Sequence, residues 1–546
     1  MTDLTFASHR SPVLARRGMV AASQPLAAQA GLEALRHGGT AADAAVATAA
    51  ALNVTEPGST GIGGDCFALY YDARTGAVTA LNGSGRAPAG LTLALARGAT
   101  DRSGELPERH AHTVTVPGAC AGWGDLVARH GRLPLALTLQ PAIELAEGGF
   151  PVAPLTAYYW QRAAEGVLRT APGGQALTLG GRGPRAGELF RNPGLGRTLR
   201  AVAEGGAEAF YRGPIAAAIA ARVQAAGGVL TAEDLAAHSS TWDEPISTVY
   251  RGLRVWECPP NGQGLTALLA LNVLAGFDVA ALDPLSVERW HLLIEALRIA
   301  FADTRWHVAD PRAVAVPTAG LLAPEYAAER RQWFDPRRAS LDVRRGAPLA
   351  GSGTVYLCAV DGEGNACSFI NSNYMGFGTG LVPGEGETSW GFSLQNRGHN
   401  FSLEAGHPNA LAPGKRPYHT IIPGLLTHAA DGSLYGPFGV MGGFMQPQGH
   451  VQVVVGLADD GLEPQAALDR LRFCIESGTA GGAVALEAGL PAALVAGLRA
   501  LGHPLTSDVS GYARAVFGRG QIIRRGADGV LWGGSDPRAD GCAVGW

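Results

Sequence analysis

Two apolar segments flank a short glycine-containing turn in this 546-residue chain. Together they limit its possible folds more than any other stretch does. The segments are TVYLCAV (354–360) and ACSFIN (366–371), and DGEGN lies between them. Apolar runs of this length around a turn with Gly362 and Gly364 predict a β-hairpin. The hairpin requires a sheet to pair with, and it begins with a threonine directly after the flexible sequence GSG.

Helical and hairpin patterns alternate along the rest of the chain. Residues 18–53 predict a strand followed by two helices, and residues 66–82 predict a second hairpin. A long amphipathic helix is expected over 286–311, and the polar, arginine-rich stretch 336–353 is the best candidate for a linker. This order indicates an α+β fold in which helices cover antiparallel sheets.

Composition excludes several classes of function. The formal net charge is −4 and no basic block stands out, so nucleic acid is not an expected partner. No apolar window is long enough to span a bilayer, and no signal peptide is recognised, so a cytoplasmic protein without membrane contact is expected. The seven cysteines include no CxxC pair, and His110 and His112 lack a third nearby ligand, so no metal site is expected.

Thr354 has two possible roles. It can simply begin a strand. Alternatively, a cut between Gly353 and Thr354 would give it a free α-amine, which could take the proton of its own hydroxyl and make that hydroxyl a nucleophile. An α-amine has a reference pKa of about 8, which is close enough to neutrality for a general base. Residue types alone leave both roles open.

The segment TVYLCAVDGEGNACSFINSNYMGFGTGLV resembles the nucleophile region of the gamma-glutamyltranspeptidase family. Further resemblances follow in order along the chain, at 18–71, TVPGACAGW (115–123), 291–311, GKRPYHTIIP (414–423) and GVMGGFMQPQGHVQVV (439–454). The resemblance implies a self-cleaving N-terminal-nucleophile hydrolase with a four-layer αββα sandwich. It implies a large fragment, 1–353, and a small fragment, 354–546, that remain together as a heterodimer, itself possibly dimeric.

The resemblance also assigns catalytic roles. Thr354 matches the nucleophile, and Ser372 matches a second hydroxyl residue that supports the nucleophile's amine. Gly442 and Gly443 match paired glycines whose N–H groups hold the oxyanion, a task that suits residues without obstructing side chains. No cofactor or metal is implied.

The substrate-binding positions depart from the family pattern. Ser84 stands where an arginine normally holds the donor's α-carboxylate, and Arg86 is displaced by two residues. Asn400 replaces the acidic residue that grips the α-amine, and Arg397 replaces a neutral amide. His419 and Thr420 replace paired serines, and Tyr374 is also expected in the substrate pocket. These changes remove a negative charge and add a guanidinium, which favours an anionic acyl group without an ammonium.

These sequence features leave three functions open. The first is a gamma-glutamyltransferase or glutathione hydrolase. The second is an amidohydrolase for another acyl group, such as oxamate or a glutaryl or cephalosporin acyl group, because NGSGRAP and LQNRGHNF resemble the glutamyltranspeptidase-like branch. The third is an uncleaved binding protein that keeps the fold. The expected partner is a small-molecule amide or gamma-glutamyl substrate.

Overall fold

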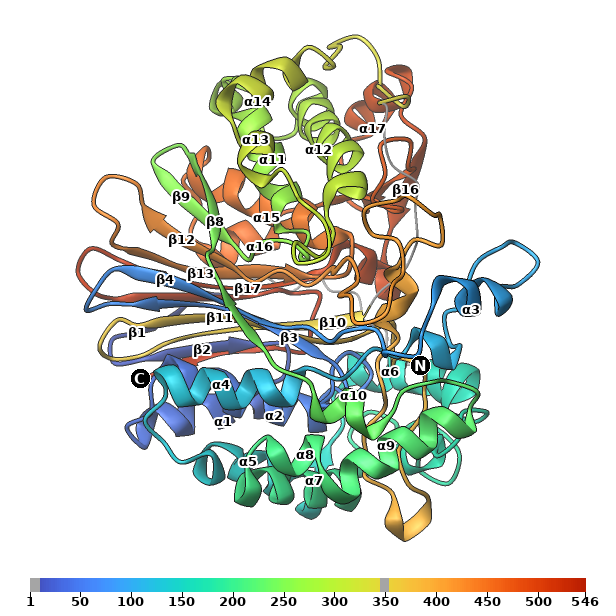
Figure 1. Cartoon of the computed structure of the whole chain (residues 1–546). Coiled ribbons are helices and arrows are strands. Elements are labelled where there is room, and N and C mark those ends of the chain that lie inside the picture. Colours follow the sequence, from blue (N-terminus) through green and yellow to red (C-terminus); the bar gives the residue numbers. More distant parts are fainter. Residues whose placement is uncertain (1–9, 344–352) are drawn as a thin grey trace.

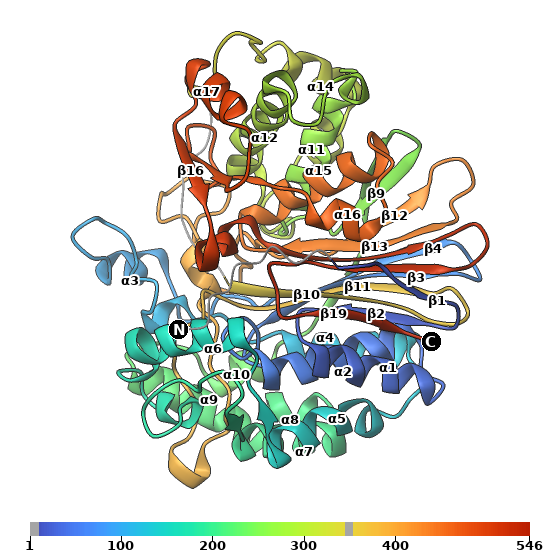
Figure 2. The same cartoon turned by 180° about the vertical axis from the view of Figure 1, so that it is seen from behind.

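The computed structural model describes residues 10–343 and 353–546. Two seven-stranded sheets are stacked face to face, and helices cover the outer face of each (Figure 1). The view from behind shows the same order of layers (Figure 2). The fold is therefore the four-layer αββα sandwich that the family resemblance implied. None of the described helices combines the length and apolar character needed to cross a membrane.

The first sheet has the predicted hairpin at its centre, and its strand pairs are antiparallel. Its order is β19 (Cys542–Gly545), β2 (Met19–Ala22), β10 (Gly353–Val360), β11 (Ala366–Tyr374), β3 (Asp65–Asp72), β4 (Ala77–Gly83) and β7 (Thr241–Asp243). Strands β10 and β11 are the expected hairpin of residues 354–371, and β3 and β4 are the expected hairpin of residues 66–82.

The second sheet is also antiparallel throughout. Its order is β1 (Val13–Ala15), β18 (Leu531–Ser535), β17 (Arg519–Arg525), β13 (Leu434–Met441), β12 (Gly424–His428), β9 (Leu253–Glu257) and β8 (Ile246–Tyr250). Both sheets contain strands from before and after residue 353. The two predicted fragments are consequently interleaved rather than separate domains.

Helices close both outer faces. On the first sheet lie α1 (Pro25–Arg36), α2 (Ala41–Thr55) and α4 (Ala119–His130), and on the second lie α11 (Gly264–Leu274), α12 (Val287–His307) and α15 (Met445–Ala458) (Figure 1). Every residue of the alanine-rich helix α2 is buried, because its small side chains allow close packing on both sides. The long helix predicted over 286–311 is α12, which ends four residues before Pro311.

The remaining elements surround this frame. The helices are α3 (Leu93–Gly98), α5 (Leu135–Gly148), α6 (Pro154–Ala163), α7 (Pro193–Gly205), α8 (Glu208–Tyr211), α9 (Gly213–Ala225), α10 (Ala232–Ala236), α13 (Thr318–Leu321), α14 (Pro324–Arg331), α16 (Pro464–Asp469) and α17 (Ala492–Ala500). The short strands are β5 (Phe150–Pro151), β6 (Leu189–Phe190), β14 (Phe473–Ile475), β15 (Val484–Glu487) and β16 (Leu505–Val509).

The linker predicted over 336–353 lies partly outside the described residues, and its first part is anchored. Ala339 N–H donates to the Leu501 carbonyl at 2.6 Å, and Ser340 N–H donates to Glu295 Oε2 at 2.9 Å. These bonds join the segment to α12 and to the end of α17, so the stretch through Ser340 is not a free linker.

The two sheets meet at a close contact between Tyr356 of β10 and Gly439 of β13. A Cβ at position 439 would lie 2.6 Å from the Tyr356 ring, and Tyr356 is buried and hydrogen-bonded through its hydroxyl to Ser368 at 2.8 Å. The ring cannot move aside without breaking that bond. Gly439 therefore sets the spacing of the two sheets at Tyr356, which is two residues after Thr354 on β10.

We expect Gly439→Ala to lower the free energy of unfolding by about 1–3 kcal/mol, the usual cost of overpacking a core. The exposed helix-terminal Gly148 is the matched control, since nothing lies within 4 Å of a Cβ added there. Chemical denaturation of both variants tests this. Equal stability of Gly439→Ala and Gly148→Ala would contradict the spacing role.

Candidate active site

Thr354 lies at an irregular point of the central hairpin. The register of β10 against β11 shifts between Gly353 and Val355, and the Thr354 side chain is buried. Its Oγ1 is 3.1 Å from Ser372 Oγ on the neighbouring strand. The two hydroxyl groups that the family resemblance paired are therefore in direct contact.

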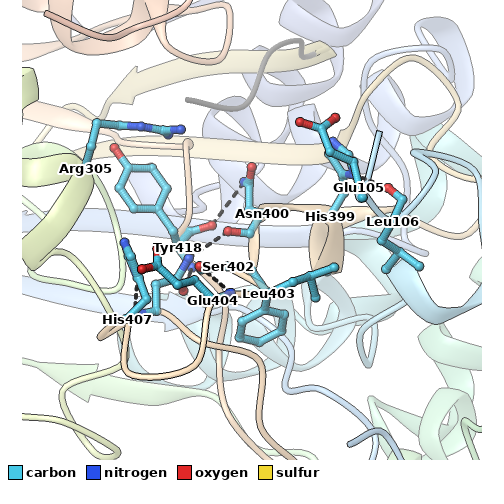
Figure 3. A pocket seen from close by; sticks show the side chains of 14 residues that line it. Glu105, Leu106, Arg305, His399, Asn400, Ser402, Leu403, Glu404, His407 and Tyr418 are labelled. Atoms are coloured by element: carbon cyan, nitrogen blue, oxygen red, sulfur yellow. Dashed lines mark hydrogen bonds between the residues drawn. The ribbon is translucent and has the colours of Figure 1, made fainter. Parts of the chain in front are cut away.

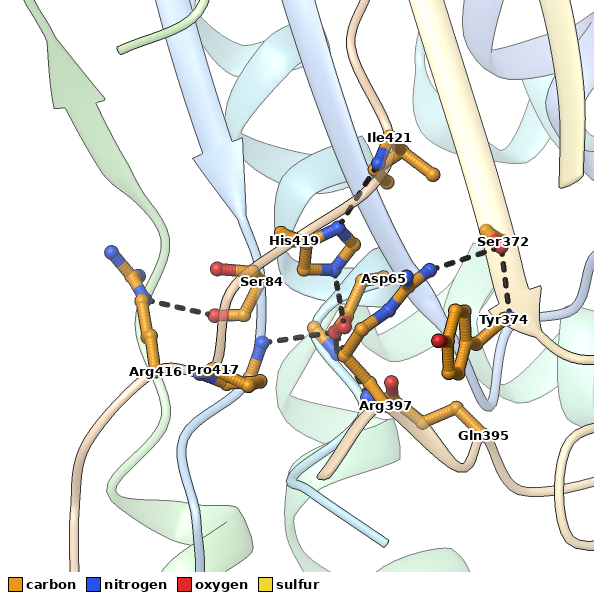
Figure 4. Close-up of polar contacts among 12 residues, drawn as sticks. Asp65, Ser84, Ser372, Tyr374, Gln395, Arg397, Arg416, Pro417, His419 and Ile421 are labelled. Atoms are coloured by element: carbon orange, nitrogen blue, oxygen red, sulfur yellow. Dashed lines mark hydrogen bonds and ion pairs between the residues drawn. The ribbon is translucent and has the colours of Figure 1, made fainter. Parts of the chain in front are cut away.

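Ser372 connects this pair to the substrate-binding positions. Its Oγ accepts a hydrogen bond from the Tyr374 N–H at 2.8 Å and another from Arg397 Nη2 at 3.2 Å (Figure 4). A guanidinium thus lies two successive contacts, of 3.1 and 3.2 Å, from the hydroxyl of Thr354.

Arg397 is completely buried and retains its charge. Its Nη1 donates to Thr420 Oγ1 at 2.6 Å, and its guanidinium carbon lies 4.2 Å from the centre of the Tyr374 ring. Burial lowers the pKa of Arg397 to about 10, so the group is still protonated at neutral pH. Within residues 10–343 and 353–546, its Nε has no hydrogen-bond partner and no carboxylate lies within ion-pair distance of it.

Asp65 supplies the nearby negative charge, and its oxygens are engaged elsewhere. Oδ1 accepts from the Gly85 N–H at 2.9 Å and from Gln395 Nε2 at 3.0 Å, and Oδ2 accepts from His419 Nε2 at 2.9 Å (Figure 4). Burial, followed by the charge of Arg397, lowers the pKa of His419 to about 3, so His419 is neutral. Sequence reasoning missed Asp65, although it follows the glycine-rich stretch GSTGIGG directly.

Tyr374 and Asn400 form the opposite side of the guanidinium site. The Tyr374 hydroxyl donates to Asn400 Oδ1 at 2.6 Å, and Asn400 Nδ2 donates to the Tyr418 carbonyl at 3.1 Å. Burial raises the pKa of Tyr374 to about 12, so the phenol stays protonated as this bond requires. The amide of Asn400 is therefore fixed between a hydroxyl donor and a carbonyl acceptor.

A cavity of about 360 Å³ adjoins this side (Figure 3). Asn400 and Tyr418 border it, together with Gly104, Glu105, Leu106, Arg305, Gly398, His399, Phe401, Ser402, Leu403, Glu404, His407 and Asn409. Its wall is polar and apolar in about equal parts and carries groups of both charge signs.

Two expected substrate-binding residues lie apart from Arg397. The Ser84 hydroxyl donates to Asn82 Oδ1 at 2.7 Å, and its carbonyl accepts from Arg416 Nε at 3.0 Å (Figure 4). The contact found for the half-buried Arg86 side chain is with the Ser239 carbonyl, at 3.4 Å. The described contacts thus bring together Thr354, Ser372, Tyr374, Arg397, Asn400 and Thr420. His419 bonds to Asp65, which is paired with Ser372 across β3 and β11, and the side chains of Ser84 and Arg86 make no described contact with this group.

Gly442 and Gly443 form the turn between β13 and α15. Their φ angles of 135° and 61° favour glycine. Both carbonyls point into the helix, since Met445 N–H donates to Gly442 and Gln446 N–H donates to Gly443. Neither glycine N–H group donates to an acceptor in the described part of the chain. Two unengaged donors in sequence are what an oxyanion-binding turn requires.

One group of metal-ligating residue types occurs among the described residues. Single ligand atoms of His291, Glu295 and His503 lie within 4.8 Å of one another. His291 Nε2 donates to the Asp335 carbonyl, so its Nδ1 accepts from His503 Nε2 at 2.8 Å. Arg298 Nε lies 3.4 Å from Glu295, and this positive charge disfavours a divalent cation. The group instead anchors the segment around Asp335 and Ser340.

The sequence profile of the family described as Gamma-glutamyltranspeptidase matches residues 27–546. The chain belongs to the gamma-glutamyltranspeptidase family. It is consequently an enzyme that acts on amide bonds.

Family relatives with several different substrates resemble the chain over nearly its full length. The "Glutathione hydrolase-like YwrD proenzyme" of Bacillus subtilis is 35% identical and covers 98% of this chain and 99% of its own length. The "Oxamate amidohydrolase proenzyme" of Klebsiella pneumoniae is 35% identical, with 97% and 98% covered. The crystal structure of cephalosporin acylase from Bacillus halodurans is 48% identical, covers 99% and 97%, and superposes with a TM-score of 0.90.

We expect Thr354→Ala to leave the chain as one uncleaved band and to abolish amidase activity, because both cleavage and turnover would need the hydroxyl. Thr354→Ser, which keeps a hydroxyl, should retain some cleavage. A denaturing gel and a mass spectrum of the small fragment's N-terminus measure this. Normal turnover by Thr354→Ala, or a fragment that begins at another residue, would contradict the assignment.

Proposed function

We propose that this protein is a self-processing N-terminal-threonine amidohydrolase whose acyl donor carries a carboxylate but no α-ammonium group. Oxamate and short dicarboxylic monoamides are the substrates of this class. One observation carries the proposal: Arg397 is a buried guanidinium beside the nucleophile pair, and no carboxylate among the described residues forms an ion pair with it. Arginine pairs with carboxylates through two parallel hydrogen bonds, so a substrate carboxylate would complete the site.

The proposed reaction begins with cleavage between Gly353 and Thr354. The freed α-amine of Thr354 takes the proton of the Thr354 hydroxyl while Oγ1 forms a bond to the substrate's amide carbon. The N–H groups of Gly442 and Gly443 stabilise the resulting oxyanion. The C–N bond of the substrate then breaks, and the leaving amine receives the proton from the α-ammonium of Thr354. Water or an acceptor amine afterwards releases the acyl group from Thr354.

Electrostatics favours this substrate class over a gamma-glutamyl group. Like charges 4 Å apart repel by about 4 kcal/mol at an effective dielectric constant of about 20. An α-ammonium beside Arg397 would meet that repulsion, and Asn400 offers it no negative charge. His419 is neutral and adds no compensating charge.

Relatives support both of the enzymatic alternatives. The oxamate named for one relative is an anion that suits the guanidinium of Arg397. The glutathione hydrolase-like relative makes gamma-glutamyl hydrolysis the second candidate. A cytoplasmic location and a heterodimer of residues 1–353 and 354–546 are further parts of the proposal. A role in glutathione metabolism belongs to the second candidate only. An uncleaved binding protein would show neither the cut nor any turnover.

We expect Arg397→Gln to lower kcat/KM for oxamate roughly 10- to 100-fold, the loss of one hydrogen-bonded charge pair. Arg397→Lys is the matched control, because it keeps the charge and loses the planar fork. It should fall between wild type and Arg397→Gln. Steady-state release of ammonia measures the effect, and unchanged oxamate turnover by Arg397→Gln would refute the substrate assignment.

We expect Asn400→Asp to raise gamma-glutamyl anilide hydrolysis relative to oxamate hydrolysis, by roughly tenfold in the ratio of kcat/KM values. The carboxylate gives an α-ammonium a partner and opposes a substrate carboxylate. It also loses the bond from Asn400 Nδ2 to the Tyr418 carbonyl, so stability should fall. Asn400→Ser loses that bond without adding charge and is the control; an equal ratio in both variants would exclude the charge effect.

A further inference from the structure

Tyr374 and Asn400 stand between the guanidinium of Arg397 and the 360 Å³ cavity. The Tyr374 ring lies on the guanidinium at 4.2 Å, and the Tyr374 hydroxyl is bonded to Asn400 Oδ1 at 2.6 Å. Asn400 borders the cavity, whereas Tyr374 and Arg397 do not. A wall of two side chains therefore separates the guanidinium from the cavity.

On the nucleophile side of this wall, the path from Thr354 to Arg397 is short. Thr354 Oγ1 is joined to Arg397 through Ser372 by contacts of 3.1 and 3.2 Å. An acyl group attacked by Thr354 and held by Arg397 must place its carbonyl carbon and its carboxylate within that span. Tyr374 is completely buried, so an extended chain has no room to continue past the guanidinium.

The far side of the wall can hold a longer polar chain. Arg305 borders the cavity, is 9% exposed, and lies over the rings of Tyr418 at 5.3 Å and Phe444 at 4.3 Å. Ser402, His407 and Asn409 add polar groups to the same space (Figure 3). The cavity thus contains one guanidinium, from Arg305, together with the carboxylates of Glu105 and Glu404.

We infer that the Tyr374–Asn400 pair is a partition that restricts the acyl group to short anionic chains, and that the cavity beyond it is an extension closed to the acyl group in the native protein. This inference rests on the proposed amidohydrolase function. It makes Tyr374 a specificity-determining residue for acyl length, separate from the carboxylate anchor Arg397.

The backbone of Tyr374 makes the partition removable. Its φ of 77° lies in the left-handed region that favours glycine, so Tyr374→Gly removes the ring at a position where glycine suits the main chain. Tyr374→Phe removes the bond to Asn400 and keeps the ring. The two variants separate the bulk of the partition from its hydrogen bond.

The test is the hydrolysis of oxamate, malonamate, succinamate and glutaramate by mature wild type, Tyr374→Gly and Tyr374→Phe. A change of one methylene in a fitted pocket alters kcat/KM by roughly 10- to 200-fold. Wild type should therefore prefer oxamate to glutaramate by at least roughly tenfold. Tyr374→Gly should raise the glutaramate-to-oxamate ratio by a similar factor, and Tyr374→Phe should keep the wild-type order.

Two results would overturn the partition. One is equal use of oxamate and glutaramate by wild type; the other is a Tyr374→Gly variant that loses activity on all four amides by the same factor. If Tyr374→Gly does not fold, Asn400→Ala opens the wall from the cavity side and should shift the ratio in the same direction. An unchanged ratio in a folded Asn400→Ala protein would also count against it.

Calorimetric binding of the diacids oxalate and glutarate separates this inference from the proposed function. If no protein hydrolyses any of the monoamides, the proposed substrate class is wrong, but the partition still predicts that glutarate binds Tyr374→Gly roughly tenfold more tightly than wild type. Equal binding of glutarate by both proteins would overturn the partition independently of turnover.

Discussion

The charge buried at Arg397 is the constraint on which the site depends. A guanidinium removed from water costs several kcal/mol unless other groups compensate for it. Here the hydroxyls of Ser372 and Thr420 and the ring of Tyr374 supply part of that compensation. Asp65 supplies the opposing charge but is held by Gly85, Gln395 and His419 instead of by Arg397. The arginine therefore keeps an open capacity for an anion.

The proposed nucleophile and the proposed specificity residues come from different parts of the sandwich and meet at one atom. Thr354 and Ser372 lie on the paired strands β10 and β11, whereas Arg397 and Asn400 belong to the irregular segment that follows. Ser372 Oγ contacts both Thr354 and Arg397. In the proposed mechanism, changes at position 397 would thus alter which acyl group binds and would also alter the electrostatic field at the Thr354 hydroxyl.

Local sequence patterns predict the helices and strands. They do not predict which residues meet in the site, because those residues are far apart in the sequence. The hairpins and the helix over 286–311 depend on neighbouring residues, and the structure contains each of them. Asp65 and His419 are 354 positions apart, so no spacing could pair them. Arg86 is expected near the substrate because of its neighbours in sequence, and the contact described for its side chain is with the Ser239 carbonyl.

The glycine-rich stretch before Asp65 illustrates the same limit. Its composition alone could suggest phosphate binding, yet a Cβ at Gly64 would lie 2.2 Å from the Ser372 carbonyl. The glycine is required because the loop packs against the strand that carries Ser372. Its role is to bring the loop close enough to β11 for the Asp65 carboxylate to reach His419.

Interleaving of the sheets explains why a cut beside Thr354 can change chemistry without releasing a domain. The first sheet joins β2, β3, β4 and β7 to β10, β11 and β19, and the second sheet is mixed in the same way. Each fragment would leave half of both cores exposed without the other. Cleavage would therefore leave the frame around Arg397 in place and change the site mainly at one atom, by converting the amide nitrogen of Thr354 into a base.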